Sequence, residues 1–224
     1  MVDFLSGSVN NQKNSVNTRA ISLSAVFSAL SVVLTMAKLT IPFPLLPYLE
    51  FDFSEIPITS VVFLIGPEYA MLSAVIYWIV LTIRAGDLLG PAMKFAAVAS
   101  MIIGFWLVSK ITNGKTQKSL QSAVTSGLVL GVVIRVLVMS VFNYVVLTVI
   151  APFWLDYAAG FVAVLGLPTT SALQTILWVL VLTGIYNLLH TVLSVVPSAF
   201  ISEAAIGRIP NLVSGSWIMQ YKKK

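Results

Sequence analysis

The sequence contains no cysteine, only one histidine and only eight acidic residues among 224. Without cysteine the chain has neither disulfide bonds nor thiolate metal sites, and the shortage of histidine and carboxylates disfavours a metal centre with several ligands. Charged residues make up 9% of the chain and hydrophobic residues 58%, whereas soluble domains carry roughly a quarter charged residues. The composition therefore predicts an all-α, polytopic membrane protein.

Motifs for catalysis and nucleotide binding are also missing. The sequence has no phosphate-cradling Gly-Lys-Ser/Thr loop and no soluble segment long enough for a nucleotide domain. Paired carboxylates without a nucleophile, metal ligands or a cleft do not make a hydrolase, so we expect no enzyme activity and no cofactor. No internal repeat is visible, which argues against an inverted-repeat secondary transporter.

Apolar runs predict six transmembrane helices. A spanning helix needs roughly 20 apolar residues, and only the second run is much shorter. Gly66-Pro67 separates this run from the third, because the residue before a proline is disfavoured in a helix. The six predicted spans cover residues 19–38, 56–65, 69–83, 92–109, 122–150 and 171–200.

The distribution of basic residues favours six spans over five. With six spans and a cytoplasmic N-terminus, nine of the thirteen basic residues lie on the cytoplasmic side, as the positive-inside rule requires. With five spans, either the N-terminal arm or the basic tail lies outside. We therefore expect cytoplasmic N- and C-termini, a flexible arm over residues 1–18, a membrane domain over 19–200 and a basic cytoplasmic tail over 201–224.

An acidic stretch between prolines, Pro47–Pro57, interrupts the apolar sequence with Glu50, Asp52 and Glu55. The six-span topology puts it at the outer face. Glu50 and Asp52 are interpreted either as a solvated loop or as the edge of a ligand site. Glu55 is interpreted as a residue that only begins a helix behind an N-cap serine.

Polar residues inside the predicted spans are the other candidates, because ionisable groups in a membrane face a cavity or a partner. Asn187 and His190 are three residues apart and share a helix face. With Asn143 they either line a pocket or form a network that fixes helix packing. Lys94 either reaches the membrane interface or meets Glu50, Asp52 or a ligand, and the direction of Arg135 is left open.

Ala25 and Ala29 are four residues apart on the first predicted helix, beside Ser24 and Ser28. Small residues at this spacing let another helix approach closely. The second helix belongs either to this chain or to a partner.

The motifs together resemble the S components of energy-coupling factor (ECF) transporters, and most closely the riboflavin-specific type. The resemblance covers residues 20–200. It is carried by Pro47–Pro57 with Gly66-Pro67, Gly90-Pro-Ala-Met-Lys-Phe95, Arg135-Val-Leu-Val-Met139 with Asn143-Tyr144, and Tyr186-Asn-Leu-Leu-His190.

The resemblance implies a six-helix cell-membrane protein that binds a vitamin from outside, under the loop between the first two spans. It implies docking on a transmembrane T component with two ABC-type ATPases, which use the ATP. The basic residues at the end of the tail, Lys222 to Lys224, suggest contact with a membrane surface rather than with nucleic acid. Ala25 and Ala29 match the family's docking contact. The residues expected at the substrate are Tyr48, Glu50, Asp52, Lys94, Asn143, Tyr144, Asn187 and His190.

Riboflavin is the first expectation for the transported ligand. His190 stands where riboflavin-type members tend to have lysine, so another vitamin or small molecule stays open as an alternative. The other alternative is a secondary transporter that works alone, which would take up substrate without ATP or partners.

Overall fold

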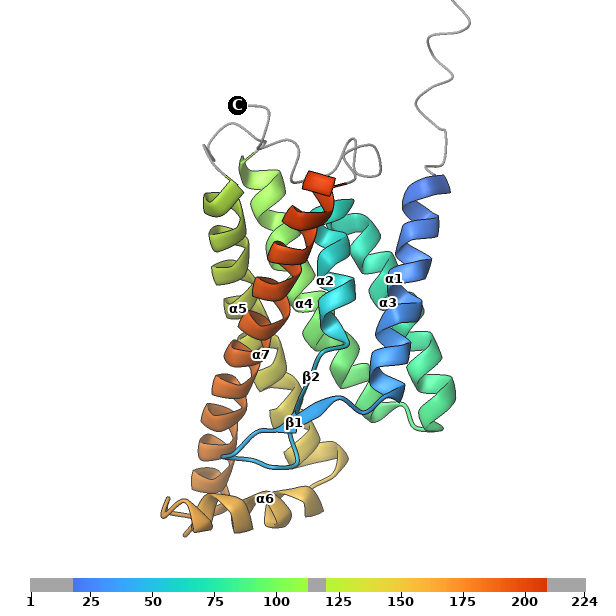
Figure 1. The fold of residues 1–224 in the computed structure, drawn as a ribbon. Coiled ribbons are helices and arrows are strands. Elements are labelled where there is room, and N and C mark those ends of the chain that lie inside the picture. Colours follow the sequence, from blue (N-terminus) through green and yellow to red (C-terminus); the bar gives the residue numbers. More distant parts are fainter. Residues whose placement is uncertain (1–17, 113–119, 209–224) are drawn as a thin grey trace, which may run out of the picture.

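The computed structural model describes residues 18–112 and 120–208, and it is helical apart from one small hairpin (Figure 1). The strands are β1 (Thr40–Pro42) and β2 (Glu50–Asp52), and a π-helical turn, η1 (Val146–Ile150), extends α5. The helices are α1 (Thr18–Met36), α2 (Glu55–Leu64), α3 (Pro67–Ala85), α4 (Leu89–Thr112), α5 (Leu120–Val145), α6 (Phe153–Val164) and α7 (Ala172–Arg208).

Within the described residues, five helices are long and apolar enough to cross a membrane: α1, α3, α4, α5 with η1, and α7. The predicted second span is α2, whose ten residues extend only about 15 Å, half of a hydrocarbon core. Six full-length spans are therefore not confirmed. In Figure 1, α1 begins and α7 ends at the same end of the bundle, while the hairpin and α6 lie at the opposite end, here called the hairpin end.

The boundaries of the elements agree with the sequence prediction in some places and differ in others. The break at Gly66-Pro67 is confirmed, since α2 ends at Leu64 and α3 begins at Pro67. Gly66 has a φ of 148°. A residue with a side chain would adopt this backbone conformation only with strain. The loop predicted after Pro152 is instead the helix α6, and the last helix continues to Arg208. The arm over 1–17 and the tail after 208 lie outside the described residues.

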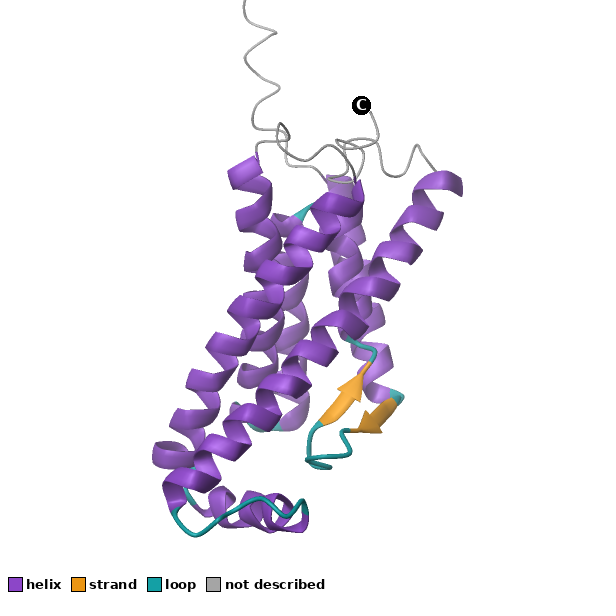
Figure 2. Ribbon diagram, turned by 90° about the vertical axis from the view of Figure 1, so that its left-hand side faces the viewer, coloured by secondary structure: helices purple, strands orange, loops and turns teal. Residues whose placement is uncertain are grey.

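The segment between α1 and α2, residues 37–54, folds back over the bundle as a hairpin (Figure 2). Its strands are antiparallel, with Thr40 opposite Asp52 and Pro42 opposite Glu50. The loop between the strands is anchored by Phe43 and Leu46, which are buried. This hairpin segment places the backbone and side chains of β2 against α7 and α4.

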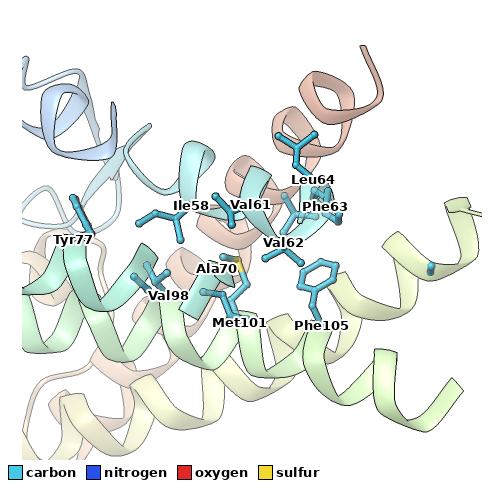
Figure 3. Close-up of a cluster of buried hydrophobic side chains, with 14 of the residues drawn as sticks. Ile58, Val61, Val62, Phe63, Leu64, Ala70, Tyr77, Val98, Met101 and Phe105 are labelled. Carbon is cyan, nitrogen blue, oxygen red and sulfur yellow. The ribbon is translucent and has the colours of Figure 1, made fainter. Parts of the chain in front are cut away.

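The main hydrophobic core surrounds α2 (Figure 3). Nine of the ten α2 residues are buried, as expected for a helix that is apolar on all sides. Ile58, Val62 and Phe63 pack with Met101 and Phe105 of α4, and Phe63 meets Phe105 edge to face. The short helix is thus held inside the bundle, with its first residue pointing toward the hairpin end.

Helix α1 packs against α3 along a stripe that includes Ser24 and Ser28. Ser28 Oγ donates to the carbonyl oxygen of Ser73 at 3.1 Å, and Ser73 Oγ donates to that of Ser24 at 3.1 Å. Ala25 and Ala29 lie on the neighbouring stripe of α1 and are exposed. In this chain the internal packing of α1 therefore uses Ser24 and Ser28.

Helices α4 and α5 approach closely at Gly104 and Gly131. A Cβ added at Gly104 would clash with the Gly131 backbone and lie 2.9 Å from the carbonyl carbon of Leu130. We expect Gly104→Ala to destabilise the protein by about 1–3 kcal/mol, because the helices must move apart. Gly160→Ala in α6 is the matched control, since an added Cβ there has no atom within 4 Å. Thermal unfolding in detergent measures both, and equal midpoints would contradict the expectation.

Candidate functional site

A cavity of about 330 Å³ opens at the hairpin end, between the hairpin segment, α2, α4, α5 and α7. We call it the polar cavity, because most of its wall residues are polar or charged. Its polar lining consists of Tyr48, Glu50, Asp52, Glu55, Lys94, Arg135, Asn143, Thr183, Tyr186, Asn187 and His190.

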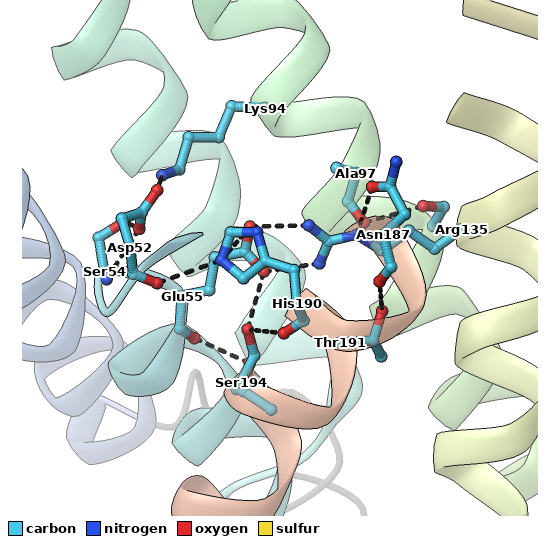
Figure 4. A network of polar contacts seen from close by, with 12 residues as sticks. Asp52, Ser54, Glu55, Lys94, Ala97, Arg135, Asn187, His190, Thr191 and Ser194 are labelled. Carbon is cyan, nitrogen blue, oxygen red and sulfur yellow. Dashed lines mark hydrogen bonds and ion pairs between the residues drawn. The ribbon is translucent and has the colours of Figure 1, made fainter. Parts of the chain in front are cut away.

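Glu55 and Arg135 form a buried ion pair in the wall of this cavity (Figure 4). Arg135 Nη1 donates to Glu55 Oε2 at 2.6 Å and Nη2 donates to Oε1 at 3.0 Å, and both side chains are about 1–2% exposed. The pair is bidentate, which satisfies the planar geometry of both groups. Glu55 does begin α2 behind Ser54, but the prediction that this was its only role is wrong, because the helix starts inside the protein and opposite Arg135.

Side chains of α7 complete the bonding of this pair. Arg135 Nε donates to Asn187 Oδ1 at 3.1 Å, and Asn187 Nδ2 donates to the carbonyl oxygen of Thr183 at 2.8 Å. Ser194 Oγ donates to Glu55 Oε2 at 3.0 Å. A buried charge is costly unless it is paired and hydrogen-bonded, and here α2, α5 and α7 each supply part of the pairing.

A second ion pair joins β2 to α4. Lys94 Nζ contacts Asp52 Oδ2, and both side chains are mostly buried. Ser54 donates to the other carboxylate oxygen through its backbone N–H at 2.9 Å and through its hydroxyl. Ser54 Oγ also shares a hydrogen bond with Tyr77 Oη at 2.8 Å. The serine therefore holds Asp52 instead of capping α2 with its side chain.

The backbone of β2 is held by α7. Tyr186 Oη donates to the carbonyl oxygen of Glu50 at 2.7 Å. His190 Nε2 lies 3.1 Å from the carbonyl oxygen of Asp52, and Nδ1 lies 3.0 Å from Tyr186 Oη. The Phe51 ring stacks on Tyr186, with ring centroids 5.0 Å apart. Thus α7 fixes β2 both by polar and by aromatic contacts.

A second cavity, of about 530 Å³, adjoins the polar one beneath α6. We call it the aromatic cavity, because Tyr48, Phe153, Trp154 and Tyr157 line it. Tyr48, with Leu49, Met93 and Asn143, lines both cavities. The Tyr48 hydroxyl is protonated at neutral pH, as is usual for tyrosine, and it can donate a hydrogen bond.

Seven of the eight predicted substrate residues line the polar cavity: Tyr48, Glu50, Asp52, Lys94, Asn143, Asn187 and His190. Tyr144 is the exception, because its side chain is 50% exposed on α5 and does not reach either cavity. Consecutive helical residues point about 100° apart, and on α5 this turn directs Asn143 to the cavities and Tyr144 to the outer surface.

Sequence reasoning left four polar lining residues unassigned to the site: Glu55, Arg135, Thr183 and Tyr186. A signal for the first two was present, because an arginine inside a predicted span requires a buried counter-charge. Glu55 lies at the start of an apolar run, which makes it the acid best placed to enter the bundle. Nothing in the sequence indicated that Tyr186 would bond the backbone of β2.

Comparison with known proteins finds a matching family model, a similar curated protein and a similar solved structure. A family model described as "ECF transporter, substrate-specific component" matches residues 19–199. The riboflavin transporter RibU of Staphylococcus aureus (strain TCH60) is 35% identical over 132 residues, which is 58% of this chain and 66% of that protein. The match thus spans just under two thirds of that relative.

A solved structure described as "Structure and mechanism of the S component of a bacterial ECF transporter" superposes with a TM-score of 0.57. The superposition covers 88% of this chain and 98% of that one, at 22% sequence identity. At this identity the likeness concerns the fold alone.

Proposed function

Because the chain belongs to the family of ECF transporter substrate-specific components, we propose that it is the vitamin-binding S component of an importer and that its ligand is riboflavin. Membership agrees with the prediction of a transporter subunit rather than an enzyme. The riboflavin assignment is supported by the 35% identity to RibU and by the chemistry of the two adjoining cavities.

The observation that carries the ligand assignment is the junction of the polar and aromatic cavities. A flavin has an apolar dimethylbenzene edge, a polar pyrimidine edge and a ribityl chain with several hydroxyls. The aromatic cavity suits the apolar edge, because stacked or edge-on rings attract each other there. Asn143 lines both cavities. Its amide nitrogen donates a hydrogen bond to the carbonyl oxygen of Met139 at 2.7 Å. Its oxygen can accept a hydrogen bond from the ligand.

The proposed topology has six membrane passes and cytoplasmic termini. The start of α1 and the end of α7 lie at the same end of the bundle (Figure 1), which an even number of passes requires. We propose that α2 together with the hairpin segment makes the second pass. The cavities then open to the outside, where the vitamin enters, and the hairpin segment covers them.

Delivery to the inside is proposed to depend on partners. The chain would dock on a transmembrane T component that carries two ABC-type ATPases, and these would hydrolyse the ATP. Ala25 and Ala29 are proposed as the docking stripe, since they are exposed while the serines beside them make the internal contact with α3.

Riboflavin binding tests the proposal directly. Titration of purified protein into riboflavin should quench the flavin fluorescence at one ligand per chain, with saturation below micromolar protein. Asn143→Leu should weaken binding about tenfold or more, because one hydrogen bond to a polar ligand group is lost. Tyr144→Phe is the matched control and should bind as the wild type does, since Tyr144 lies outside both cavities.

Absence of quenching at micromolar concentrations would reject riboflavin. Mass spectrometry of the small molecule that co-purifies with the chain would then identify the ligand. A different vitamin would retain the S-component proposal, whereas uptake into vesicles that contain only this chain and no ATP would favour the secondary transporter.

A further inference from the structure

A row of three hydroxyl groups connects α1 to the hairpin segment. Thr35 Oγ1 of α1 lies 2.6 Å from Tyr77 Oη of α3, and Tyr77 Oη lies 2.8 Å from Ser54 Oγ of the hairpin segment. Ser54 Oγ in turn contacts Asp52 Oδ1. This hydroxyl row therefore joins α1 and α3 to the carboxylate that pairs with Lys94 of α4.

The carboxylate gives the hydroxyl row a direction. An ionised carboxylate can only accept hydrogen bonds, so Ser54 donates to Asp52 and its oxygen is left to accept from Tyr77. Tyr77 Oη can then accept from Thr35, and three hydrogens fill three contacts, which strengthen one another. The carbonyl oxygen of Ser31, 3.1 Å from Thr35 Oγ1, is a second acceptor for the first hydroxyl. Either arrangement leaves Tyr77 Oη between Thr35 and Ser54.

The position of Tyr77 separates it from the ligand. It lines neither the polar nor the aromatic cavity, its side chain is 2% exposed, and Ser54 is fully buried. The Tyr77 ring packs in the main hydrophobic core, and Lys94 Nζ lies 5.8 Å from the ring centroid. Tyr77 can therefore act on a ligand only through Asp52 and Lys94, which do line the polar cavity.

We propose that Tyr77 is a positioning residue for ligand binding. Its hydroxyl links the segment after β2 to α1, and this link fixes the Asp52–Lys94 pair at the edge of the polar cavity. The link itself requires no ligand, while its effect on affinity rests on the proposed function. Loss of the hydroxyl loosens the hairpin segment and weakens ligand binding, although no group that lines a cavity is changed.

Because the chain has no cysteine, one introduced thiol can report on the hairpin segment. Leu46→Cys replaces a side chain of the hairpin loop that is 0% exposed, so a water-soluble maleimide reacts there after local opening. In ligand-free, full-length protein, adding Tyr77→Phe should raise the modification rate about fivefold, the effect of one lost hydrogen bond. Tyr69→Phe, the same change at the start of α3, should leave the rate unchanged. If Tyr77→Phe and Tyr69→Phe gave equal rates, the link would be refuted.

Val164→Cys is the control for the reagent, because its side chain is 86% exposed on α6. Its modification rate should be the same in the wild-type, Tyr77→Phe and Tyr69→Phe backgrounds. A fivefold rise at Leu46→Cys against a constant rate at Val164→Cys would support opening of the hairpin segment, whereas parallel rises at both thiols would reject it.

Riboflavin affinity tests the positioning role. Tyr77→Phe keeps the ring and should raise the Kd about five- to tenfold, while Thr35→Val removes one of the two contacts of Tyr77 Oη and should raise it about two- to threefold. In the Tyr77→Phe background, Thr35→Val should change the Kd no further, because both substitutions break the same hydroxyl row. Effects that multiply independently would overturn the positioning role. Thr35→Val alone tests it should Tyr77→Phe fail to fold, and a wild-type Kd would then reject it.

The two measurements separate this inference from the proposed function. A protein that binds no riboflavin but shows faster modification of Leu46→Cys with Tyr77→Phe would refute the ligand assignment and keep the link. A protein that binds riboflavin equally well with and without the Tyr77 hydroxyl, at equal modification rates, would do the reverse.

Discussion

Replacement of Arg135 by methionine should destabilise the protein by about 3–5 kcal/mol, the usual cost of leaving one buried ion without its partner. Glu55 would then keep only Ser194 at 3.0 Å and His190 at 3.6 Å as close polar neighbours. The Glu55 side chain is about 2% exposed, so its carboxylate depends on protein groups for most of its hydrogen bonds. The measurement is the thermal or denaturant-induced unfolding of the purified protein in detergent.

The double variant Glu55→Met with Arg135→Met shows whether the loss comes from the unpaired charge. Removing both ions leaves an apolar contact, and such replacements are often near neutral. We expect the double variant to be more stable than Arg135→Met by several kcal/mol. Arg84→Met is the matched control, because Arg84 is exposed at the end of α3, and it should change stability by less than about 0.5 kcal/mol. If Arg135→Met behaved like this control, the buried pair would not hold the site together.

Hydropathy predicted the long helices because that signal is local. Each of the five long spans consists of contiguous apolar residues, and the break at Gly66-Pro67 is likewise encoded within two residues. Helix α6 was missed since its 12 residues are too few for a span and follow a proline. The hairpin was missed because β1 and β2 pair across a loop, and strand pairing depends on residues that are distant in sequence.

The candidate site was predictable to the extent that polar groups inside spans are rare. Asn187, His190 and Lys94 were recognised for that reason, and all three line the polar cavity. Their partners were not predictable, since Glu55 and Arg135 are 80 residues apart and only the packing of α2 against α5 and α7 brings them together. Tyr144 was assigned by adjacency to Asn143, and the turn of the helix moves it to the outer surface.

Two sets of polar contacts hold the site together, one deep in the bundle and one at its rim. The Glu55–Arg135 pair ties α2 to α5 deep in the bundle. The hairpin segment is attached to the bundle by polar contacts at its rim, from Lys94 to Asp52 and from α7 to the backbone of β2. Phe43 and Leu46 of the hairpin segment are also buried in an apolar cluster with residues of α6 and α7, so the segment is held by apolar packing as well as by these polar contacts.

Substitution of Ala25 and Ala29 by tryptophan should abolish riboflavin uptake in cells or proteoliposomes that contain the T component and ATPases. Uptake should fall to the level seen without the S component, because bulky side chains prevent close approach of a partner helix. The riboflavin Kd of the purified double variant should stay within about twofold of the wild type, since both alanines are exposed and line neither cavity.

Two further variants separate docking from general effects of bulk on the membrane-facing surface. Leu137→Trp places the same side chain on α5, where Leu137 is exposed, and should leave both uptake and binding intact. Ser24→Trp, in contrast, enters the buried contact with α3 and should reduce folding, binding and uptake together. If the variants at Ala25 and Ala29 behaved like Ser24→Trp, the alanines would serve internal packing. Selective loss of uptake would instead mean that α1 has two separate stripes, serines for its own fold and alanines for a partner.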